Sequence, residues 1–425
     1  MRRTFFNPTT PVLLEHYRRE IERCVKCGCC RAVCPPFLQK KGESYSARGR
    51  MALIKAVLER KLSVSDIFKD RLATCTGCLA CEASCPSGVP VAEIIQAAKE
   101  QAVRESGIGI ISGIVSEVLK HPAALQATAW LAPILLHYSK GRGLAGTKGQ
   151  DDSEDYSVQR TRYTSTGSYA LQRTRRRVAF FSGCAIDNFQ PEIGRATKNV
   201  LNYLGYEVIN PKGLKCCGRP LLSLGLRAAA EEHAAYNISV LSALKADAII
   251  TACASCGSTF KKDYPKLLRP DGNQLAIIDI HEFLSMKLEG IRLAPCAGSV
   301  TVHEPCHLSR GQGLSNVISN LLRSIPQLTI REMRNADRCC GFGGMMRVTH
   351  RKLSDSIAQE KVRDIIATQA DTVVTGCPGC SMQISNALIL ASSTAKVVHT
   401  VQLLEKALTI ANYELHDSDL EIVRR

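Results

Sequence analysis

Cysteine constrains this chain more than any other residue type. Twenty of its 425 residues are cysteine, nine of them between Cys24 and Cys85 and eleven between Cys184 and Cys380. The opening MRRTFFNPTT has no apolar block of the kind that a secretory signal carries, so we expect a cytoplasmic protein whose thiols stay reduced. In that setting the cysteines are predicted to be metal ligands rather than disulfides.

Charge and hydropathy narrow the possible partners. The formal net charge is +16, but aromatic residues make up only 5% and do not interleave with the basic runs, so we expect no nucleic-acid partner. Thiolate ligands on metal clusters add negative charge that the formal count ignores. Part of the excess of lysine and arginine therefore balances the charge of the clusters. The longest uncharged apolar stretch, residues 122–136, is shorter than the roughly 18 residues that cross a bilayer.

Two runs of four cysteines, each followed by proline, are the strongest motif. They read CxxCxxCxxxCP from Cys24 and again from Cys75, the spacing of bacterial ferredoxins in which the fourth cysteine ligates the other cluster. We therefore predict two [4Fe-4S] clusters, one held by Cys24, Cys27, Cys30 and Cys85 and the other by Cys75, Cys78, Cys81 and Cys34. Zinc is the alternative, since it also binds CxxC pairs. The additional Cys29 is expected to be a buried small residue.

The C-terminal half is an internal duplication. Cys184 and Cys306 are 122 residues apart, the two Cys-Cys-Gly motifs 123, and the two final CxxC pairs 124. β-branched or aromatic runs lead into the first and last cysteines of each copy and helical stretches separate them, which predicts βαβ units with a parallel sheet. Ligand sites form at the carboxyl ends of such strands. The two predicted sites are Cys184, Cys216, Cys217, Cys253 and Cys256, and Cys306, Cys339, Cys340, Cys377 and Cys380.

These patterns predict an α+β multi-domain protein. A helical two-cluster ferredoxin-type domain is expected over residues 1–105, followed by a helical segment and linker over 106–177. Two α/β domains named here after their Cys-Cys-Gly motif, the CCG domains, are expected over 178–295 and 296–425. The linker assignment follows from a stretch rich in Gly, Ser, Thr and charge that lacks apolar periodicity.

The chemistry of the five-cysteine sites is left open by the residues alone. Five thiols per copy exceed the four that zinc or a simple cubane needs. The alternatives are an open iron-sulfur cluster that does thiol or disulfide chemistry, a relay cluster, a structural zinc site, and a CxxC dithiol that exchanges with disulfides. No catalytic residue is assigned.

Several residues near the cysteines are weaker candidates. His303 and His307 flank Cys306 and are candidates to donate a hydrogen bond to a cluster sulfur or to take a proton, with a local structural role as the alternative. His281 and His399 lie beside apolar runs and are expected to be structural. Arg219 and Arg347, which follow the vicinal cysteines, are candidates to neutralise cluster charge, with a structural role expected. Cys296 receives no function.

No glycine-rich phosphate-binding fingerprint is present. GFGGMM at residues 341–346 contains glycines, but it follows a cysteine pair and lacks the GxGxxG spacing. A flavin or nicotinamide, if used, is therefore expected on another chain.

The whole pattern resembles a known family. Duplicated CCG repeats behind a two-cluster ferredoxin domain are similar to the iron-sulfur subunits of glycolate oxidase, anaerobic glycerol-3-phosphate dehydrogenase and heterodisulfide reductase. Ala47-Arg48-Gly49-Arg50 with the following MALIKAVLE, and Glu304-Pro305-Cys306-His307, resemble the glycolate oxidase group. The resemblance implies an electron-transfer subunit of an FAD-dependent glycolate or D-lactate dehydrogenase. Its FAD would lie on a partner chain, and electrons would pass toward quinone, with the chain cytoplasmic or peripheral on the inner face of the cytoplasmic membrane.

One departure keeps a second function open. Glycolate oxidase subunits can lack some cysteines of these repeats, whereas this chain has all five in each copy, as in the catalytic subunit of heterodisulfide reductase. In that enzyme the complete motif binds non-cubane [4Fe-4S] clusters at which a disulfide is cleaved. The resemblance therefore implies one or two further [4Fe-4S] clusters in the CCG domains, either as relays or as reductase centres.

Overall fold

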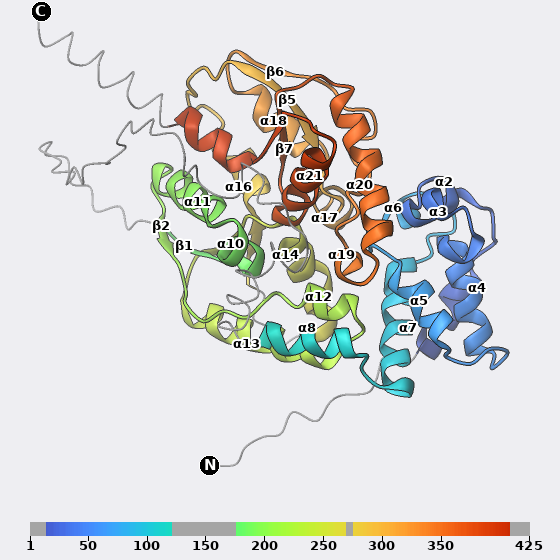
Figure 1. The fold of residues 1–425 in the computed structure, drawn as a ribbon. Helices are drawn as coiled ribbons and strands as arrows, with labels where there is room; N and C mark the ends of the chain where they lie inside the picture. Colours follow the sequence, from blue (N-terminus) through green and yellow to red (C-terminus); the bar gives the residue numbers. More distant parts are fainter. Residues whose placement is uncertain (1–13, 121–175, 269–274, 409–425) are drawn as a thin grey trace, which may run out of the picture.

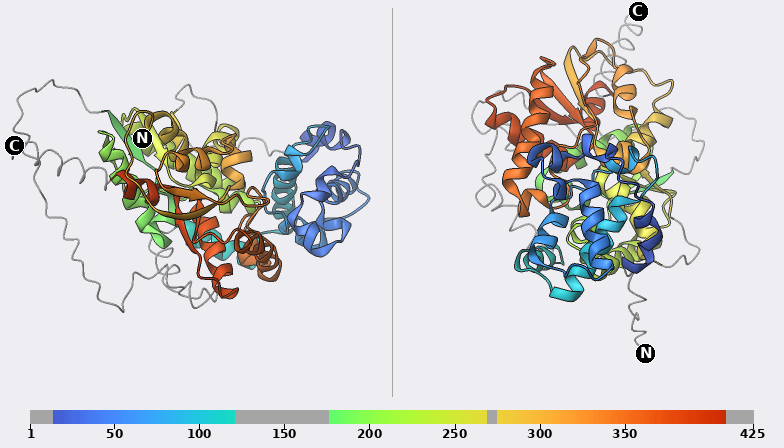
Figure 2. Two further views of the ribbon diagram at one scale, coloured as in Figure 1. Left: turned by 90° about the horizontal axis from the view of Figure 1, so that it is seen from above. Right: turned by 90° about the vertical axis from the view of Figure 1, so that its right-hand side faces the viewer.

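The computed structural model describes residues 14–120, 176–268 and 275–408. A helical N-terminal body is followed by two α/β bodies (Figure 1). Seen from above, the helical body lies at one end of the molecule and the two α/β bodies lie together at the other (Figure 2). The predicted α+β class, with a helical N-terminal part and a duplicated α/β half, is confirmed.

Short helices build the N-terminal body around a small apolar core that includes Ile54 and Ile94. Ser46 and Ser65 start α4 and α5, because their hydroxyls accept hydrogen bonds from backbone amides one turn later, at 3.0 and 3.2 Å. The elements are η1 (Leu14–Tyr17), α1 (Arg18–Glu22), α2 (Cys29–Ala32), α3 (Pro35–Lys40), η2 (Glu43–Tyr45), α4 (Ala47–Leu58), α5 (Asp66–Ala73), α6 (Ala80–Ala83) and α7 (Val91–Ser106).

Each α/β body contains a four-stranded parallel sheet, as the βαβ pattern predicts. The strand orders are β2-β1-β3-β4 and β6-β5-β7-β8, so the two copies share one topology. The β3 strand is buried along its whole length, as expected for a parallel strand covered on both faces. The strands are β1 (Arg177–Phe180), β2 (Glu207–Ile209), β3 (Ala248–Thr251), β4 (Ile277–Asp279), β5 (Gly298–His303), β6 (Leu328–Ile330), β7 (Thr372–Thr375) and β8 (Lys396–His399).

Helices connect the strands in both copies. In the first copy they are α10 (Gly183–Phe189), α11 (Pro191–Tyr203), α12 (Arg219–Ser223), α13 (Arg227–Ala243), α14 (Ala254–Ser258), the π-helical turn η3 (Thr259–Asp263), α15 (Tyr264–Leu267) and α16 (Ile280–Lys287). In the second copy they are α17 (Cys306–Gln312), α18 (Val317–Arg323), α19 (Met346–Thr349), α20 (Arg351–Ile366) and α21 (Pro378–Leu390).

In the described part of the chain between the N-terminal body and the first sheet lies the helix α8 (Ile110–Lys120). Its Leu119 packs against the small apolar cluster around Leu221 and Leu222. Residues 121–175, which contain the longest apolar stretch and most of the predicted linker, lie outside the described residues, so the linker stays a prediction. Within the described ranges, no helix is both long and apolar enough to cross a membrane.

The N-terminal body docks on both α/β bodies. The Lys99 side chain on α7 donates a hydrogen bond to the Ser223 carbonyl at the end of α12, at 2.9 Å. On the second body, Gly343 and Gly344 lie against the backbone of Cys75 and Thr76, and a β-carbon at Gly344 would collide with the Cys75 carbonyl oxygen. The glycine-rich segment therefore allows two backbones to approach closely instead of binding a phosphate.

We predict that Gly344→Ala loosens this docking. Gly344 has a φ of +69°, so alanine adds a backbone cost of about 1–2 kcal/mol and, through overpacking, about 1–3 kcal/mol more. Gly290→Ala is the matched control, because Gly290 has a φ of +78° and open space around its α-carbon. Thermal unfolding of the anaerobically isolated chain should show a larger fall in Tm for Gly344→Ala. Equal falls would show that backbone conformation alone matters there.

Candidate iron-sulfur centres

The ferredoxin-type cysteines line two adjacent cavities in the N-terminal body. The first is lined by Cys24, Cys27, Cys30 and Cys85, together with Cys29 and Cys81. The second is lined by Cys34, Cys75, Cys78 and Cys81. The fourth cysteine of each run thus faces the cavity of the other run. The donor set fits an iron-sulfur cluster, since four thiols surround each cavity, and the ligand assignment itself stays a prediction.

Glycines shape the loops that carry these thiols. Gly28 and Gly77 have φ angles of +91° and +65°, a left-handed conformation that other residues adopt only at a cost. Each lies within a CxxC turn, so the chain can bend sharply between neighbouring thiols. The two loops can therefore wrap closely around one corner of each cavity.

Cys29 departs from the expectation of a buried small residue, because its side chain is exposed. It follows the left-handed Gly28 and begins α2, which turns the side chain away from the core. The Cys29 amide and thiol both hydrogen-bond to the Cys27 sulfur, and these bonds lower the pKa of Cys27. Cys29 is thus a polar neighbour of a predicted ligand.

Arg50 is a contact that the sequence alone did not identify. Its guanidinium is only 1% exposed and lies 3.9 Å from the Cys34 sulfur. Hydrogen bonds to the Arg71 carbonyl and the Thr74 hydroxyl hold it there, at 2.7 and 2.8 Å. Burial raises the pKa of Cys34, and the Arg50 charge opposes that rise. A buried cation at this position favours the thiolate that a metal needs.

The CCG cysteines lie at the carboxyl ends of the two parallel sheets, as predicted. Cys184 and Cys253 follow β1 and β3, and their counterparts Cys306 and Cys377 follow β5 and β7. Within the first set, the Cys184 and Cys216 sulfurs are 3.5 Å apart. Within the second set, the Cys340 and Cys380 sulfurs are 3.4 Å apart.

Contacts between thiols also join the sets to one another. The Cys253 and Cys377 thiols of the two CCG sets lie close enough to shift each other's pKa, and the Ser255 hydroxyl of the first body is 3.7 Å from the Cys377 sulfur. The Cys78 thiol of the N-terminal body and the Cys339 thiol of the second CCG set also shift each other's pKa. The predicted sites therefore form one series, in the order first ferredoxin cavity, second ferredoxin cavity, second CCG set and first CCG set.

Hydrogen bonds between neighbouring CCG thiols lower the pKa of some thiols and raise the pKa of others. A hydrogen bond from the Cys216 thiol holds the pKa of Cys217 well below its usual range, and one from Cys339 does the same for Cys340. A hydrogen bond from Cys253 lowers the pKa of Cys377. The partner thiols, among them Cys216 and Cys253, have pKa values raised well above the usual range, so each set combines thiols that favour the thiolate with thiols that favour the protonated form.

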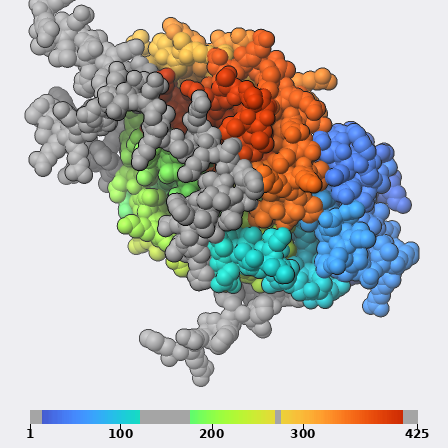
Figure 3. Space-filling view, viewed as in Figure 1, coloured from blue at the N-terminus to red at the C-terminus, as the bar shows by residue number. Residues whose placement is uncertain are grey.

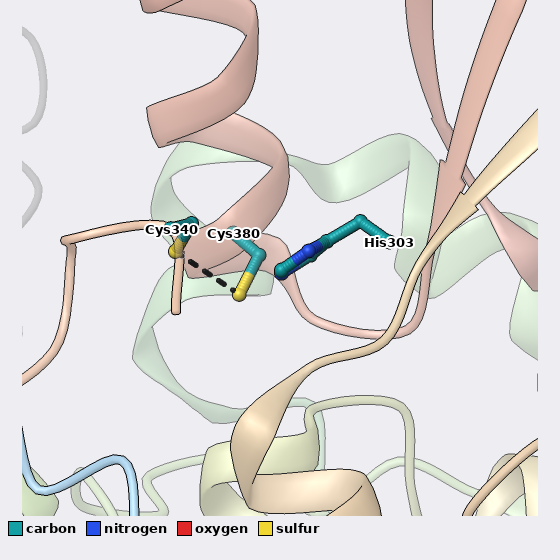
Figure 4. A group of neighbouring side chains, drawn as sticks. All are labelled: His303, Cys340 and Cys380. Atoms are coloured by element: carbon teal, nitrogen blue, oxygen red, sulfur yellow. Dashed lines mark hydrogen bonds between the residues drawn. The ribbon is translucent and has the colours of Figure 1, made fainter. Parts of the chain in front are cut away.

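His303 points at the second CCG set. Its ring lies beside Cys340 and Cys380, and the three ligand atoms are within 4.8 Å of one another (Figure 4). The side chain is fully buried, and burial holds its pKa well below the usual value. Neither ring nitrogen has a partner of normal hydrogen-bond geometry among the described residues, and the Ala336 carbonyl makes only a weaker polar contact with the ring.

His307 links the three bodies. Its Nδ1 lies 2.9 Å from the Ser255 hydroxyl of the first CCG body, and its Nε2 lies 3.2 Å from the Gly77 carbonyl of the N-terminal body. Burial lowers its pKa to about 4, so the ring is neutral at physiological pH. One turn later, the Arg310 guanidinium donates to the Cys78 carbonyl at 2.9 Å. This end of α17 therefore fastens the second ferredoxin loop.

The surroundings of the remaining candidates are as follows. Arg219 pairs with Asp263 at 3.1 Å, and its charge and backbone amide also help to lower the pKa of Cys217, so its predicted role beside a cluster stays a prediction. Arg347 pairs with Asp355. His281 is fully buried and contacts Asp279 and Thr400, at 2.7 and 3.1 Å. His399 is also fully buried, and its Nδ1 accepts a hydrogen bond from the Val401 amide at 3.3 Å. Cys296 is buried in the large apolar core that the two α/β bodies share.

Family models and relatives agree with this arrangement. A 4Fe-4S dicluster domain matches residues 20–89, and a cysteine-rich domain matches residues 178–261 and 300–385. A subunit of the fumarate reductase (CoM/CoB) of Methanothermobacter marburgensis is 29% identical over 92% of this chain and 73% of its own length. The probable glycolate oxidase iron-sulfur subunit of Bacillus subtilis is 27% identical over 91% of this chain and 94% of its own.

Two further relatives extend the comparison. A subunit of the dihydromethanophenazine:CoB--CoM heterodisulfide reductase of Methanosarcina barkeri is 27% identical over 92% of this chain and 95% of its own length. Lactate utilization protein A of Bacillus cereus is 30% identical over 54% of this chain and 98% of its own. This chain is therefore an iron-sulfur subunit of an oxidoreductase and belongs to the CCG-domain family that includes the iron-sulfur subunits of glycolate oxidase and heterodisulfide reductase.

Proposed function

We propose that this chain is the electron-transfer subunit of an FAD-dependent 2-hydroxy-acid dehydrogenase that oxidises glycolate or D-lactate and passes electrons toward quinone. The observation that carries the proposal is the continuous series of thiol sites. Cys78 meets Cys339, and Cys253 meets Cys377, so adjacent sites are in contact from the N-terminal body to the first CCG sheet. A series without gaps suits a relay between a donor and an acceptor held on other surfaces.

The proposed ligands are the cysteines that line these sites. Cys24, Cys27, Cys30 and Cys85 would hold one [4Fe-4S] cluster and Cys75, Cys78, Cys81 and Cys34 the other, with one or two further clusters on the CCG sets. When bound, such clusters supply transfer of single electrons. The chain contributes the thiols, the buried cation at Arg50 and the close docking of the three bodies. The domains proposed for these roles are residues 1–105, 178–295 and 296–425, with residues 106–177 between the first two.

The proposed reaction needs a flavoprotein partner, because the proposed clusters of this chain transfer single electrons. Hydroxy-acid oxidation removes two electrons at once, and a flavin can take both and release them singly. The sequence has no dinucleotide fingerprint, so the FAD is placed on a partner. The names of the Bacillus relatives, a glycolate oxidase subunit and a lactate utilization protein, favour glycolate or lactate as the donor.

The α8 helix supports an acceptor at a membrane surface or on a membrane partner. It turns Ser116 toward the protein, at 8% exposure, while Ile110 and Ile114 on its other face are 84% and 60% exposed. Figure 3 shows this helix in cyan at the surface of the molecule. The helix therefore carries apolar side chains on both faces, because Leu119 packs on the protein while the isoleucines face outward. An outward apolar face of this kind suits contact with lipid or with a partner that carries electrons to quinone.

A second function is favoured by the completeness of the CCG sets. Both sets keep all five cysteines, and the two sets touch through Cys253 and Cys377. A disulfide substrate needs two electrons, and two adjacent one-electron centres can provide them. The second candidate is therefore a heterodisulfide-reductase-like subunit that cleaves a disulfide at a non-cubane [4Fe-4S] cluster.

Anaerobic isolation of the native complex, through a tag on this chain, tests the main proposal. We expect a flavoprotein to copurify, and addition of glycolate or D-lactate to bleach the cluster absorption, because electrons from the acid reach the clusters through the flavin. The absence of flavin, or clusters that respond only to thiols and disulfides, would favour the reductase instead.

The ferredoxin ligands are tested by a matched pair of substitutions. Cys30→Ser removes a predicted ligand and should lower the iron content by about four atoms per chain, the content of one cubane. Cys29→Ser changes the next residue, which is exposed and is not a predicted ligand, and should leave the iron content unchanged. Iron and acid-labile sulfide analysis measures both. Equal losses in the two variants would contradict the assignment.

Substitution in the CCG sets separates relay from catalysis. If the second CCG set cleaves a disulfide, Cys340→Ser should abolish disulfide reduction while the ferredoxin clusters still accept electrons from dithionite. If the set is a relay, the same variant should instead slow electron transfer from hydroxy acid to quinone. Cys217→Ser makes the equivalent change in the first set. Normal cluster content and normal turnover in both variants would contradict both assignments.

A further inference from the structure

The two CCG sets sit in nearly identical surroundings. In each copy the first strand runs into the first cysteine, and the third strand, β3 or β7, ends in a fully buried threonine before the CxxC pair. His303 pairs with Thr375 across β5 and β7. The position 122 residues earlier is Phe181, which directly follows β1. The two sites are thus built alike, with phenylalanine in one and histidine in the other.

Phe181 makes an entirely apolar site. It is fully buried, and its ring packs edge-on against Phe260 with centroids 4.7 Å apart. It also lies next to Cys256, since both contact the space beside Gly183 where a β-carbon would stand. A phenyl ring has no N–H group, so it cannot donate a conventional hydrogen bond to anything that Cys256 holds.

His303 occupies the equivalent place beside Cys380 and carries the group that Phe181 lacks. A neutral imidazole has one N–H donor and one acceptor nitrogen. Neither nitrogen has a partner of normal hydrogen-bond geometry among the described residues, although the side chain is fully buried, and only the Ala336 carbonyl makes a weaker polar contact with the ring. Leaving a buried polar group without a partner costs about 1–3 kcal/mol. The ring is directed at Cys340 and Cys380 (Figure 4), so the partner it lacks belongs at the centre which those thiols would hold.

We propose that His303 donates its N–H to a sulfur of the second CCG centre and raises its reduction potential above that of the first. The inference rests on the proposed function, in which each CCG set holds an iron-sulfur cluster. Reduction adds negative charge to such a centre, and a donor aimed at its sulfur stabilises the reduced state more than the oxidised state. His303 is a positioning and tuning residue, because five cysteines already provide the ligands.

The proposed difference in reduction potential affects where an electron rests along the series of sites. The second CCG set touches the N-terminal body through Cys339 and Cys78, while the first set touches only the second among the predicted sites. A higher potential at the second set therefore favours an electron there over the first set, which lies at the end of the series.

Exchange of the two side chains tests the proposal. Full-length His303→Phe, Phe181→His and His303→Gln are isolated anaerobically, and their CCG signals are titrated by electron paramagnetic resonance against potential. Cys340→Ser and Cys217→Ser identify which signal belongs to which set. We expect His303→Phe to shift the second signal to lower potential and Phe181→His to shift the first to higher potential. His303→Gln, which keeps an N–H donor, should restore part of the loss.

Iron content and the ferredoxin signals are the controls, and both should match the unchanged chain. The proposal is overturned if His303→Phe leaves the potential of the second signal unchanged, or if it removes iron while folding is retained, since the histidine would then be a ligand. If His303→Phe does not fold, the reduction potentials of the CCG signals in Phe181→His and His303→Gln test the proposal instead. If the unchanged chain gives no CCG signal, the proposed cluster assignment fails first and this inference fails with it.

Discussion

The close contact between α14 and α17 is the constraint on which the rest of the site depends. Gly257 and Gly311 lie in this contact, where β-carbons would stand 2.6 Å from the Gln312 side chain and 2.7 Å from the Ser258 hydroxyl. Gln312 crosses it to bond the Ala254 carbonyl and the Asp279 carboxylate, at 3.2 and 2.9 Å. Because each helix begins at a CxxC pair or a first cysteine, this packing brings the carboxyl ends of two separate sheets together.

The sequence predicted those parts of the molecule that follow from local spacing. The ferredoxin runs, the duplication and the two parallel sheets can be read from the chain, because β-branched runs and cysteine offsets repeat within each copy. The meetings of Cys253 with Cys377 and of Cys78 with Cys339 cannot, since spacing tells which thiols share a loop and not which loops meet. Arg50 was visible only as part of a resembling segment, and its contact with Cys34 depends on how α4 packs.

The two histidines beside Cys306 also show that sequence position does not reveal the surroundings of a side chain. His303 and His307 were both candidates because they flank Cys306, yet their surroundings differ sharply. His307 has two partners from two other bodies, and His303 has none of normal hydrogen-bond geometry among the described residues. Comparison of the copies by their 122-residue offset places Phe181 opposite His303, and that comparison was available from the sequence. Burial was the missing information, because only a buried histidine without a partner requires an explanation.

The thiols differ in their access to water along the series. Cys27 and Cys29 at the first ferredoxin cavity are exposed, whereas eight of the ten CCG cysteines are buried. Small oxidants and chelators dissolved in water therefore meet the outermost ferredoxin loop first. Oxidative damage should therefore begin at that loop, and the CCG cysteines behind the docked bodies can stay reduced after the outer cysteines have been oxidised.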